Sequence, residues 1–188
     1  IVFSLGGILD DYLVKNAGIH KEKIVHAPAG INENWLADIL TEKNSDTYKF
    51  LFIGRDDKIK GLNEYLNAIE TAIKKLNVKA EFHFIGNLKR SVENKIPYLF
   101  FHGEITDEEI LKSEISKCDV LVCPSLSEGF PLVILESFSC RVPVIATDVG
   151  AISSVVNNNN GWLITPGNID ALSDAIIDVT CQPKTTLT

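Results

Sequence analysis

The sequence predicts a doubly wound α/β domain with a Rossmann-like parallel sheet. Short apolar runs alternate with longer amphipathic segments, and this alternation is typical of βα units. The predicted strands are largely apolar, as expected where helices cover both faces of a sheet; they span residues 49–53, 81–85, 99–102, 120–123, 142–147 and 162–164. The predicted helices lie between and after them, at residues 62–76, 107–116, 131–140, 151–156 and 169–179.

The helix at residues 62–76 follows from the spacing of its apolar residues. These residues recur every three or four positions, which places them on one helix face: Leu62, Tyr65, Leu66, Ile69 and Ile73. The loops after Ile53, Cys123 and Thr147 all leave the predicted sheet at its carboxyl edge. Ligands of such sheets bind at that edge, so the site is expected there.

Length and charge exclude several classes of function. The chain has 188 residues, which is enough for one well-buried domain and too few for two of typical size. A net charge of −7 argues against nucleic-acid binding and gives no support for attraction to an anionic membrane. The sequence contains no apolar run long enough to span a bilayer and no N-terminal signal pattern.

Cysteine usage indicates a reducing compartment. The four cysteines are Cys118, Cys123, Cys140 and Cys181, and no two form a Cys-x-x-Cys pair. Neither a zinc site nor a disulfide framework is indicated. We therefore expect a cytoplasmic protein, with peripheral association at the inner membrane face as an option. The chain begins at Ile1 and contains no Met, so we expect it to be a piece of a longer protein.

The segment from Cys123 to Pro143 carries the most informative motif. An apolar strand stops at Pro124, a polar turn with Glu128 and Gly129 follows, and Pro131 is suited to the first position of a helix. Free N–H groups at a helix N-terminus after a flexible glycine form an anion site. Glu136 lies further along the same helix. Two carboxylates beside an anion site suit a ligand with both phosphates and hydroxyls, such as a sugar nucleotide.

These residues resemble a known family. The segment Glu128–Glu136, Glu-Gly-Phe-Pro-Leu-Val-Ile-Leu-Glu, is similar to the Glu-x7-Glu signature of the retaining glycosyltransferases of the GT-B fold, family four, also called glycosyl transferases group 1. Four further segments resemble that family in the right order: residues 52–61, 82–86, 143–150 and 160–166. The resemblance covers roughly residues 24 to 180 and implies the C-terminal, donor-binding domain.

The resemblance also implies roles for individual residues. Arg55 and Lys60, in the loop Gly54–Gly61, would contact the donor diphosphate and stabilise its departure. Glu128 would accept hydrogen bonds from the donor sugar, and Glu136 would bind the ribose hydroxyls. The remaining donor-binding positions are expected to act largely through their backbone: Gly54, Ile105, Gly129, Phe130, Pro131 and Leu132. Lys58 matches no fixed family position, and we expect it to be solvated.

The resemblance divides the chain in two. Residues 1–23 resemble the tail of an N-terminal acceptor domain together with the linker, and contain one predicted strand and one predicted helix. Residues 24–188 form the predicted donor domain, which opens with the strand and turn at residues 24–31. One departure from the family lies after Glu136, where Arg141 stands at a position that commonly carries glycine. Glycine is preferred at a helix C-terminus for its left-handed conformation, so this departure concerns packing more than chemistry.

Several alternative motifs are absent from the sequence. It contains no Gly-x-Gly-x-x-Gly fingerprint, no P-loop and no Asp-x-Asp metal-binding motif. We therefore expect no cofactor and no metal, with cations and helix N-termini neutralising the leaving diphosphate.

We thus expect transfer of a sugar from a UDP- or GDP-linked donor to a hydroxyl of a glycan, lipid or small molecule, with retention, in a setting such as polysaccharide biosynthesis. The chain alone is expected to be inactive, because acceptor binding is assigned to the missing domain. Two alternatives stay open: a non-catalytic sugar-nucleotide-binding module and a GT-B-type sugar-nucleotide epimerase.

Overall fold

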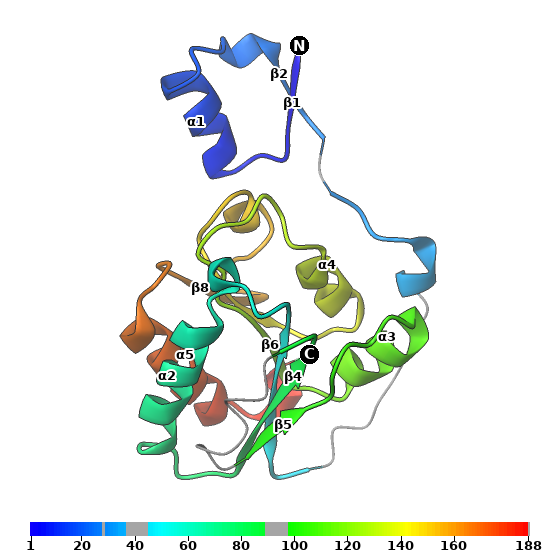
Figure 1. Cartoon of the computed structure of the whole chain (residues 1–188), viewed down its shortest axis with the longest axis vertical. Helices are drawn as coiled ribbons and strands as arrows, with labels where there is room; N and C mark the ends of the chain where they lie inside the picture. The colour runs from blue at the N-terminus through cyan, green and yellow to red at the C-terminus, as the bar shows by residue number, and fades with distance from the viewer. Residues whose placement is uncertain (28, 37–44, 89–97, 188) are drawn as a thin grey trace.

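Six parallel strands form the central sheet of the computed structural model, which describes residues 1–27, 29–36, 45–88 and 98–187 (Figure 1). The strand order is β5–β4–β3–β6–β7–β8, and every neighbouring pair runs parallel. The strands are β3 (Tyr48–Ile53), β4 (Ala80–Ile85), β5 (Leu99–Phe101), β6 (Val120–Cys123), β7 (Val144–Thr147) and β8 (Gly161–Ile164). The predicted fold class is confirmed, since the chain reverses its strand order between β5 and β6 as doubly wound sheets do.

Helices cover both faces of this sheet. On one face lie α2 (Leu62–Ile73) and α5 (Ile169–Cys181), which pack against each other. On the other lie α3 (Glu108–Ser116), α4 (Leu132–Ser139) and the 3-10 turn η2 (Glu33–Leu36). Side chains cap the starts of two of the described α-helices: Asp107 accepts from two backbone N–H groups of α3, and Asn168 accepts from one of α5. Such caps stabilise a helix by about 1 kcal/mol each.

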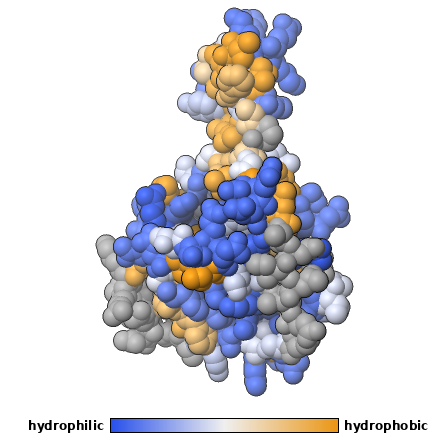
Figure 2. Space-filling model, turned by 90° about the vertical axis from the view of Figure 1, so that its right-hand side faces the viewer, coloured by the Kyte–Doolittle hydropathy of each residue, from blue (hydrophilic) through white to orange (hydrophobic). Residues whose placement is uncertain are grey.

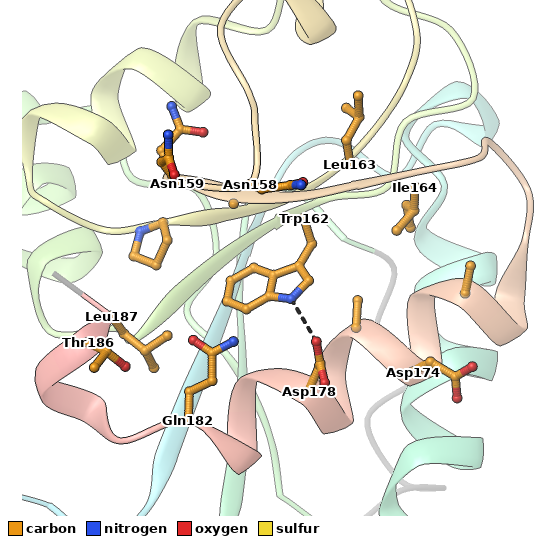
Figure 3. A pocket seen from close by; sticks show the side chains of 15 residues that line it. Asn158, Asn159, Trp162, Leu163, Ile164, Asp174, Asp178, Gln182, Thr186 and Leu187 are labelled. Atoms are coloured by element: carbon orange, nitrogen blue, oxygen red, sulfur yellow. Dashed lines mark hydrogen bonds between the residues drawn. The ribbon is translucent and has the colours of Figure 1, made fainter.

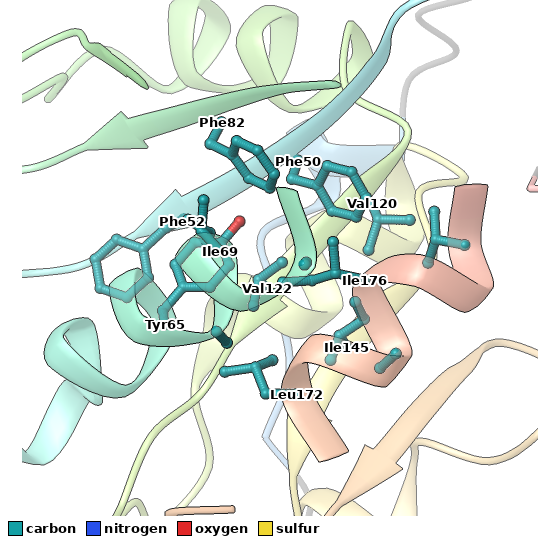
Figure 4. Packing of buried hydrophobic residues seen from close by; sticks show 14 of the residues in the cluster. Phe50, Phe52, Tyr65, Ile69, Phe82, Val120, Val122, Ile145, Leu172 and Ile176 are labelled. Atoms are coloured by element: carbon teal, nitrogen blue, oxygen red, sulfur yellow. The ribbon is translucent and has the colours of Figure 1, made fainter. Parts of the chain in front are cut away.

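Aromatic side chains dominate the core between the sheet and α2 (Figure 4). Phe50 and Phe82 stack across β3 and β4 with ring centroids 5.2 Å apart. Phe52 and Phe84 pack beside them against Tyr65 of α2. All five rings are almost fully buried. Each contributes roughly 1.5–3 kcal/mol through burial, so this cluster holds β3 rigidly under the loop that follows it.

The first 26 residues form a separate small unit. Strand β1 (Val2–Ser4) pairs in parallel with β2 (Ile24–His26), and α1 (Ile8–Lys15) lies between them in sequence. This unit projects from the carboxyl-edge side of the main sheet (Figure 1), and apolar surface gathers on it (Figure 2). Ile1 and Phe3 are 86% and 72% exposed. Because the predicted opening strand of the donor domain pairs here with β1, the domain boundary at residue 24 stays a prediction.

Most predicted elements match the structure to within one to three residues, and one does not. The segment predicted as a helix over residues 151–156 forms a single 3-10 turn, η5 (Ile152–Ser154). Short 3-10 turns also occur at η1 (Lys21–Lys23), η3 (Lys58–Lys60) and η6 (Lys184–Thr186). Within the described residues, the helices are too short or too polar to cross a membrane.

Candidate functional site

The loop between β3 and α2 presents Lys60 at the carboxyl edge of the sheet. Its 3-10 turn η3 is capped by Asp57, whose side chain accepts the N–H of Ile59. The turn ends at Gly61, which has a φ of 68° in the left-handed region and leads directly into α2. Only glycine adopts this conformation without strain. The local sequence therefore fixes the position of the Lys60 backbone, from which its side chain extends.

A second loop, between β6 and α4, is joined to the first by backbone contacts. The N–H of Leu126 donates to the carbonyl of Ile59 at 2.7 Å. A Cβ on Gly61 would come within 1.9 Å of the Pro124 carbonyl oxygen, so the two main chains meet without room for a side chain. The two loops consequently form one surface, although about 65 residues separate them in sequence.

Lys60 and Glu128 meet across these two loops. The Lys60 ammonium forms a partly buried ion pair with the Glu128 carboxylate, their side chains being 23% and 14% exposed. The hydroxyl of Ser125 also donates to Glu128 Oε1, at 3.2 Å. The cation and the carboxylate predicted to serve the diphosphate and the sugar thus occupy adjacent positions, and each is held by the other.

Helix α4 begins immediately after this turn. Pro131 is the residue before the helix, not its first residue as predicted, and the helix starts at Leu132. The difference follows from the extended backbone of Pro131, whose ψ is 115°. The first N–H groups of any helix have no acceptor within it, so anion binding at this N-terminus stays a prediction.

The loop after β7 supports the Glu128 turn. A Cβ on Gly150 would lie 2.2 Å from the carbonyl oxygen of Glu128 and 2.3 Å from that of Gly129. The N–H of Ala151 donates to the carbonyl of Gly129 at 2.9 Å. On its other side, the Gly150 carbonyl accepts the N–H of Ile8 at 3.0 Å. The small N-terminal unit therefore touches the same loop that supports the turn.

A cavity of about 260 Å³ opens at the carboxyl ends of β3 and β4. It brings together four of the predicted site residues, Gly54, Arg55, Lys60 and Ile105. Its other lining residues are Ile53, Ile85, Gly86, Asn87 and Glu104. Of these, Glu104 belongs to the segment at residues 102–105, which the family resemblance relates to nucleobase binding. The position of Gly86 directly after a predicted strand was the signal available for that edge, whereas Asn87 lies in a loop without a distinctive pattern.

The other predicted residues do not line this cavity. Glu136 is half-buried on α4, and burial raises the pKa of its carboxyl, with the charge of Glu108 as a smaller cause. Glu108 begins α3, directly after the loop that carries Ile105. The cavity lining includes neither Glu136 nor the turn at residues 129–132, which comprises Gly129, Phe130, Pro131 and Leu132.

A larger cavity, of about 720 Å³, lies elsewhere, between β8 and α5 (Figure 3). Trp162 reaches into it, and its indole N–H donates to Asp178 at 3.3 Å. Asn158 and Asn159, before β8, and Gln182, after α5, also line it. None of the predicted site residues does so. It opens near the amino ends of β7 and β8, away from the Lys60–Glu128 pair, so volume alone does not locate the site.

Comparison with known families identifies the chain. The model of the family "Glycosyl transferases group 1" matches residues 47–181. The chain belongs to this family. Among curated proteins, it is 34% identical over 126 residues to the putative teichuronic acid biosynthesis glycosyltransferase TuaC of Bacillus subtilis (strain 168), covering 67% of this chain and 31% of TuaC. The chain therefore spans well under half the length of this relative.

Solved structures agree on the fold. A structure of HepE from Anabaena in complex with UDP superposes with a TM-score of 0.78 at 20% identity, covering 100% of this chain and 56% of HepE. The C-terminal domain of the glycosyl transferase group 1 family protein LpcC from Francisella tularensis superposes with a TM-score of 0.65 at 27% identity, covering 74% of this chain and 78% of that domain. The chain has the fold of a C-terminal GT-B glycosyltransferase domain.

Proposed function

We propose that this chain is the donor-binding domain of a retaining glycosyltransferase, which transfers a sugar from a nucleotide-diphosphate sugar to an acceptor hydroxyl. The observation that carries the proposal is the meeting of Lys60 and Glu128 beside the cavity lined by Arg55. Cations there suit the diphosphate, and an adjacent carboxylate suits the hydroxyls of the attached sugar. The complex of HepE with UDP, in the same fold, is consistent with this assignment.

Each end of the donor has a proposed partner. Arg55 and Lys60, with the N-terminus of α4 at Leu132, would neutralise the diphosphate as it leaves. Glu128 would hold the sugar hydroxyls. Glu136 would accept both hydroxyls of the ribose, since a carboxylate can accept two such bonds.

The loop that carries Ile105 is proposed to lie against the nucleobase. It lines the cavity beside Arg55, and α3, which follows it, brings the charge of Glu108 close enough to affect Glu136. The base and the ribose would thus bind side by side. Backbone groups of Gly54 and of the turn at residues 129–132 complete the proposed donor contacts.

The reaction would proceed without a metal ion and without a covalent intermediate. In the proposed mechanism, Arg55 and Lys60 stabilise the departing diphosphate in the place of a divalent cation. The acceptor hydroxyl would attack from the face that the leaving group vacates and pass its proton to the departing diphosphate oxygen, which retains configuration at the sugar. Glu128 then positions the sugar and does not act as a nucleophile.

The acceptor would be held by a second domain that this chain does not contain. The exposed apolar side chains of the β1–β2 unit support this view, since a two-stranded sheet is only marginally stable alone. We infer that the chain by itself binds donor and does not transfer sugar.

Calorimetry on the chain with UDP, GDP and their glucose conjugates tests this proposal. We expect one nucleotide to bind, and Arg55→Ala and Glu136→Ala each to weaken it by roughly ten-fold or more, as for hydrogen bonds to charged groups. Lys58→Ala is the matched control, because Lys58 is exposed in the same loop and absent from the cavity lining. No binding by a folded chain, or equal losses in all three variants, would contradict the proposal.

A further inference from the structure

The Glu128 carboxylate has two partners of very different mobility. Lys60 reaches it through a long flexible side chain, whereas Ser125 reaches it through a short one that is 2% exposed. Under the proposed function, Lys60 turns toward the diphosphate when donor binds. The ion pair then weakens, and Ser125 remains the partner of Glu128 on its own loop.

Ser125 is itself fixed by the neighbouring strand. Thr147, at the end of β7, donates its hydroxyl to the Ser125 carbonyl at 2.5 Å. Thr147 is also 2% exposed, so water does not compete for this bond. The main chain at Ser125 is thereby held to the rigid sheet, and the position of its side chain follows from that of the main chain.

The hydrogen bonds among Cys123, Ser125 and Glu128 can run in only one donor-to-acceptor order. A carboxylate accepts hydrogen bonds only, and a serine hydroxyl has one proton to give. The proton of Ser125 therefore goes to Glu128. The Sγ of Cys123 lies 3.7 Å from the Ser125 oxygen and must then be the donor of that contact. Burial raises the pKa of the Cys123 thiol to about 11, so it keeps its proton at neutral pH.

We propose that Ser125 is a positioning residue for Glu128: it holds Oε1 when Lys60 leaves for the diphosphate, so that the carboxylate stays oriented toward the donor sugar. The inference rests on the proposed function of this site. The hydrogen bonds that link Cys123, Ser125 and Glu128 would keep the carboxylate oriented after the Lys60–Glu128 ion pair has opened. Thr147 supports the same arrangement through the Ser125 carbonyl.

Binding measurements separate positioning from general damage. Ser125→Ala should weaken UDP-glucose by about three- to ten-fold, the effect of one lost hydrogen bond, and leave the affinity for UDP unchanged. Thr147→Val should likewise lower the affinity for UDP-glucose relative to the affinity for UDP. The control is Ser116→Ala, because Ser116 is equally buried at 2% exposure and lies at the end of α3. Equal losses for UDP and UDP-glucose, or no loss for either, would overturn the inference.

Crystal structures of two variants test the positioning without any ligand. In Lys60→Met, the Glu128 carboxylate should stay in place on Ser125. In Ser125→Ala combined with Lys60→Met, it should leave that position or become disordered. An unmoved carboxylate in the double variant refutes the role of Ser125 even if nucleotide binds. Failure of the wild-type chain to bind any nucleotide would instead refute the proposed function, with the Ser125 result still decided by these structures.

Discussion

Replacing Gly61 with alanine should break the junction between the two site loops. Gly61 has a φ of 68°, and a Cβ there would lie 1.9 Å from the Pro124 carbonyl oxygen and 2.8 Å from its carbon. Neither atom belongs to a flexible side chain. The two loops would have to separate by about 1.6 Å to restore ordinary contact distances of about 3.5 Å.

The cost of this change has two parts. A non-glycine residue in the left-handed region costs roughly 1–2 kcal/mol, partly offset by the lower entropy of the unfolded alanine variant, about 0.4–1 kcal/mol. Separation of the loops also strains the bond from Leu126 N–H to the Ile59 carbonyl, whose loss costs about 1–3 kcal/mol. The total is about 3 kcal/mol.

Urea denaturation followed by circular dichroism measures this cost. With a slope of about 2 kcal/mol per molar urea, Gly61→Ala should lower the midpoint by about 1.5 M. The control is Gly103→Ala, because Gly103 has a φ of 72° and open space where its Cβ would lie. It should lose about 1 kcal/mol, or about 0.5 M. Equal midpoints for the two variants would refute the claim that the loops are in direct contact.

Three further predictions concern single residues. At pH 8, a thiol reagent should label Cys181, which is exposed, and spare the buried Cys118, Cys123 and Cys140 until urea is added; rapid labelling of a second thiol would contradict the packing. Burial raises the pKa of Glu136, so the folded state binds the proton of this carboxyl more tightly than the unfolded state does. Ionised Glu136 therefore destabilises the fold as the pH rises through its pKa, and Glu136→Gln should stabilise the protein more at pH 8 than at pH 4. A gain in stability that does not depend on pH would contradict this prediction. Arg141 has a φ of 56°, so Arg141→Gly should be more stable than Arg141→Ala by about 0.5–1 kcal/mol in thermal unfolding, and the reverse order would exclude strain there.

The strands and long helices could be predicted from the sequence because their patterns are local. Short, largely apolar runs marked β3, β4 and β6 to within one residue of their observed bounds. Strand β7 begins at Val144, two residues later than predicted, since Pro143 has no N–H to donate to a neighbouring strand. The pairing of β2 with β1 could not be predicted, because two short runs about 20 residues apart do not reveal their partners.

The sequence singled out parts of the candidate site but not the contacts that bring those parts together. Helix-start residues and loop charges pointed to Lys60 and Glu128 separately, and the carboxyl-edge rule placed their loops on one side of the sheet. Their direct ion pair depends on the contact of Gly61 with Pro124, which no spacing rule contains. The buried partner Ser125 was missed for the same reason, since its role depends on Thr147 from another strand.

The central claim is that donor binds at the carboxyl edge and not in the larger cavity between β8 and α5. Backbone amide shifts of the ¹⁵N-labelled chain, followed during separate titrations with UDP-glucose and GDP-glucose, test it most directly. The account predicts the largest shifts at Arg55, Ile105 and Leu132, with little change around Trp162 and Asp178. Shifts confined to those last two residues and their neighbours, or no saturable shift at all, would contradict it.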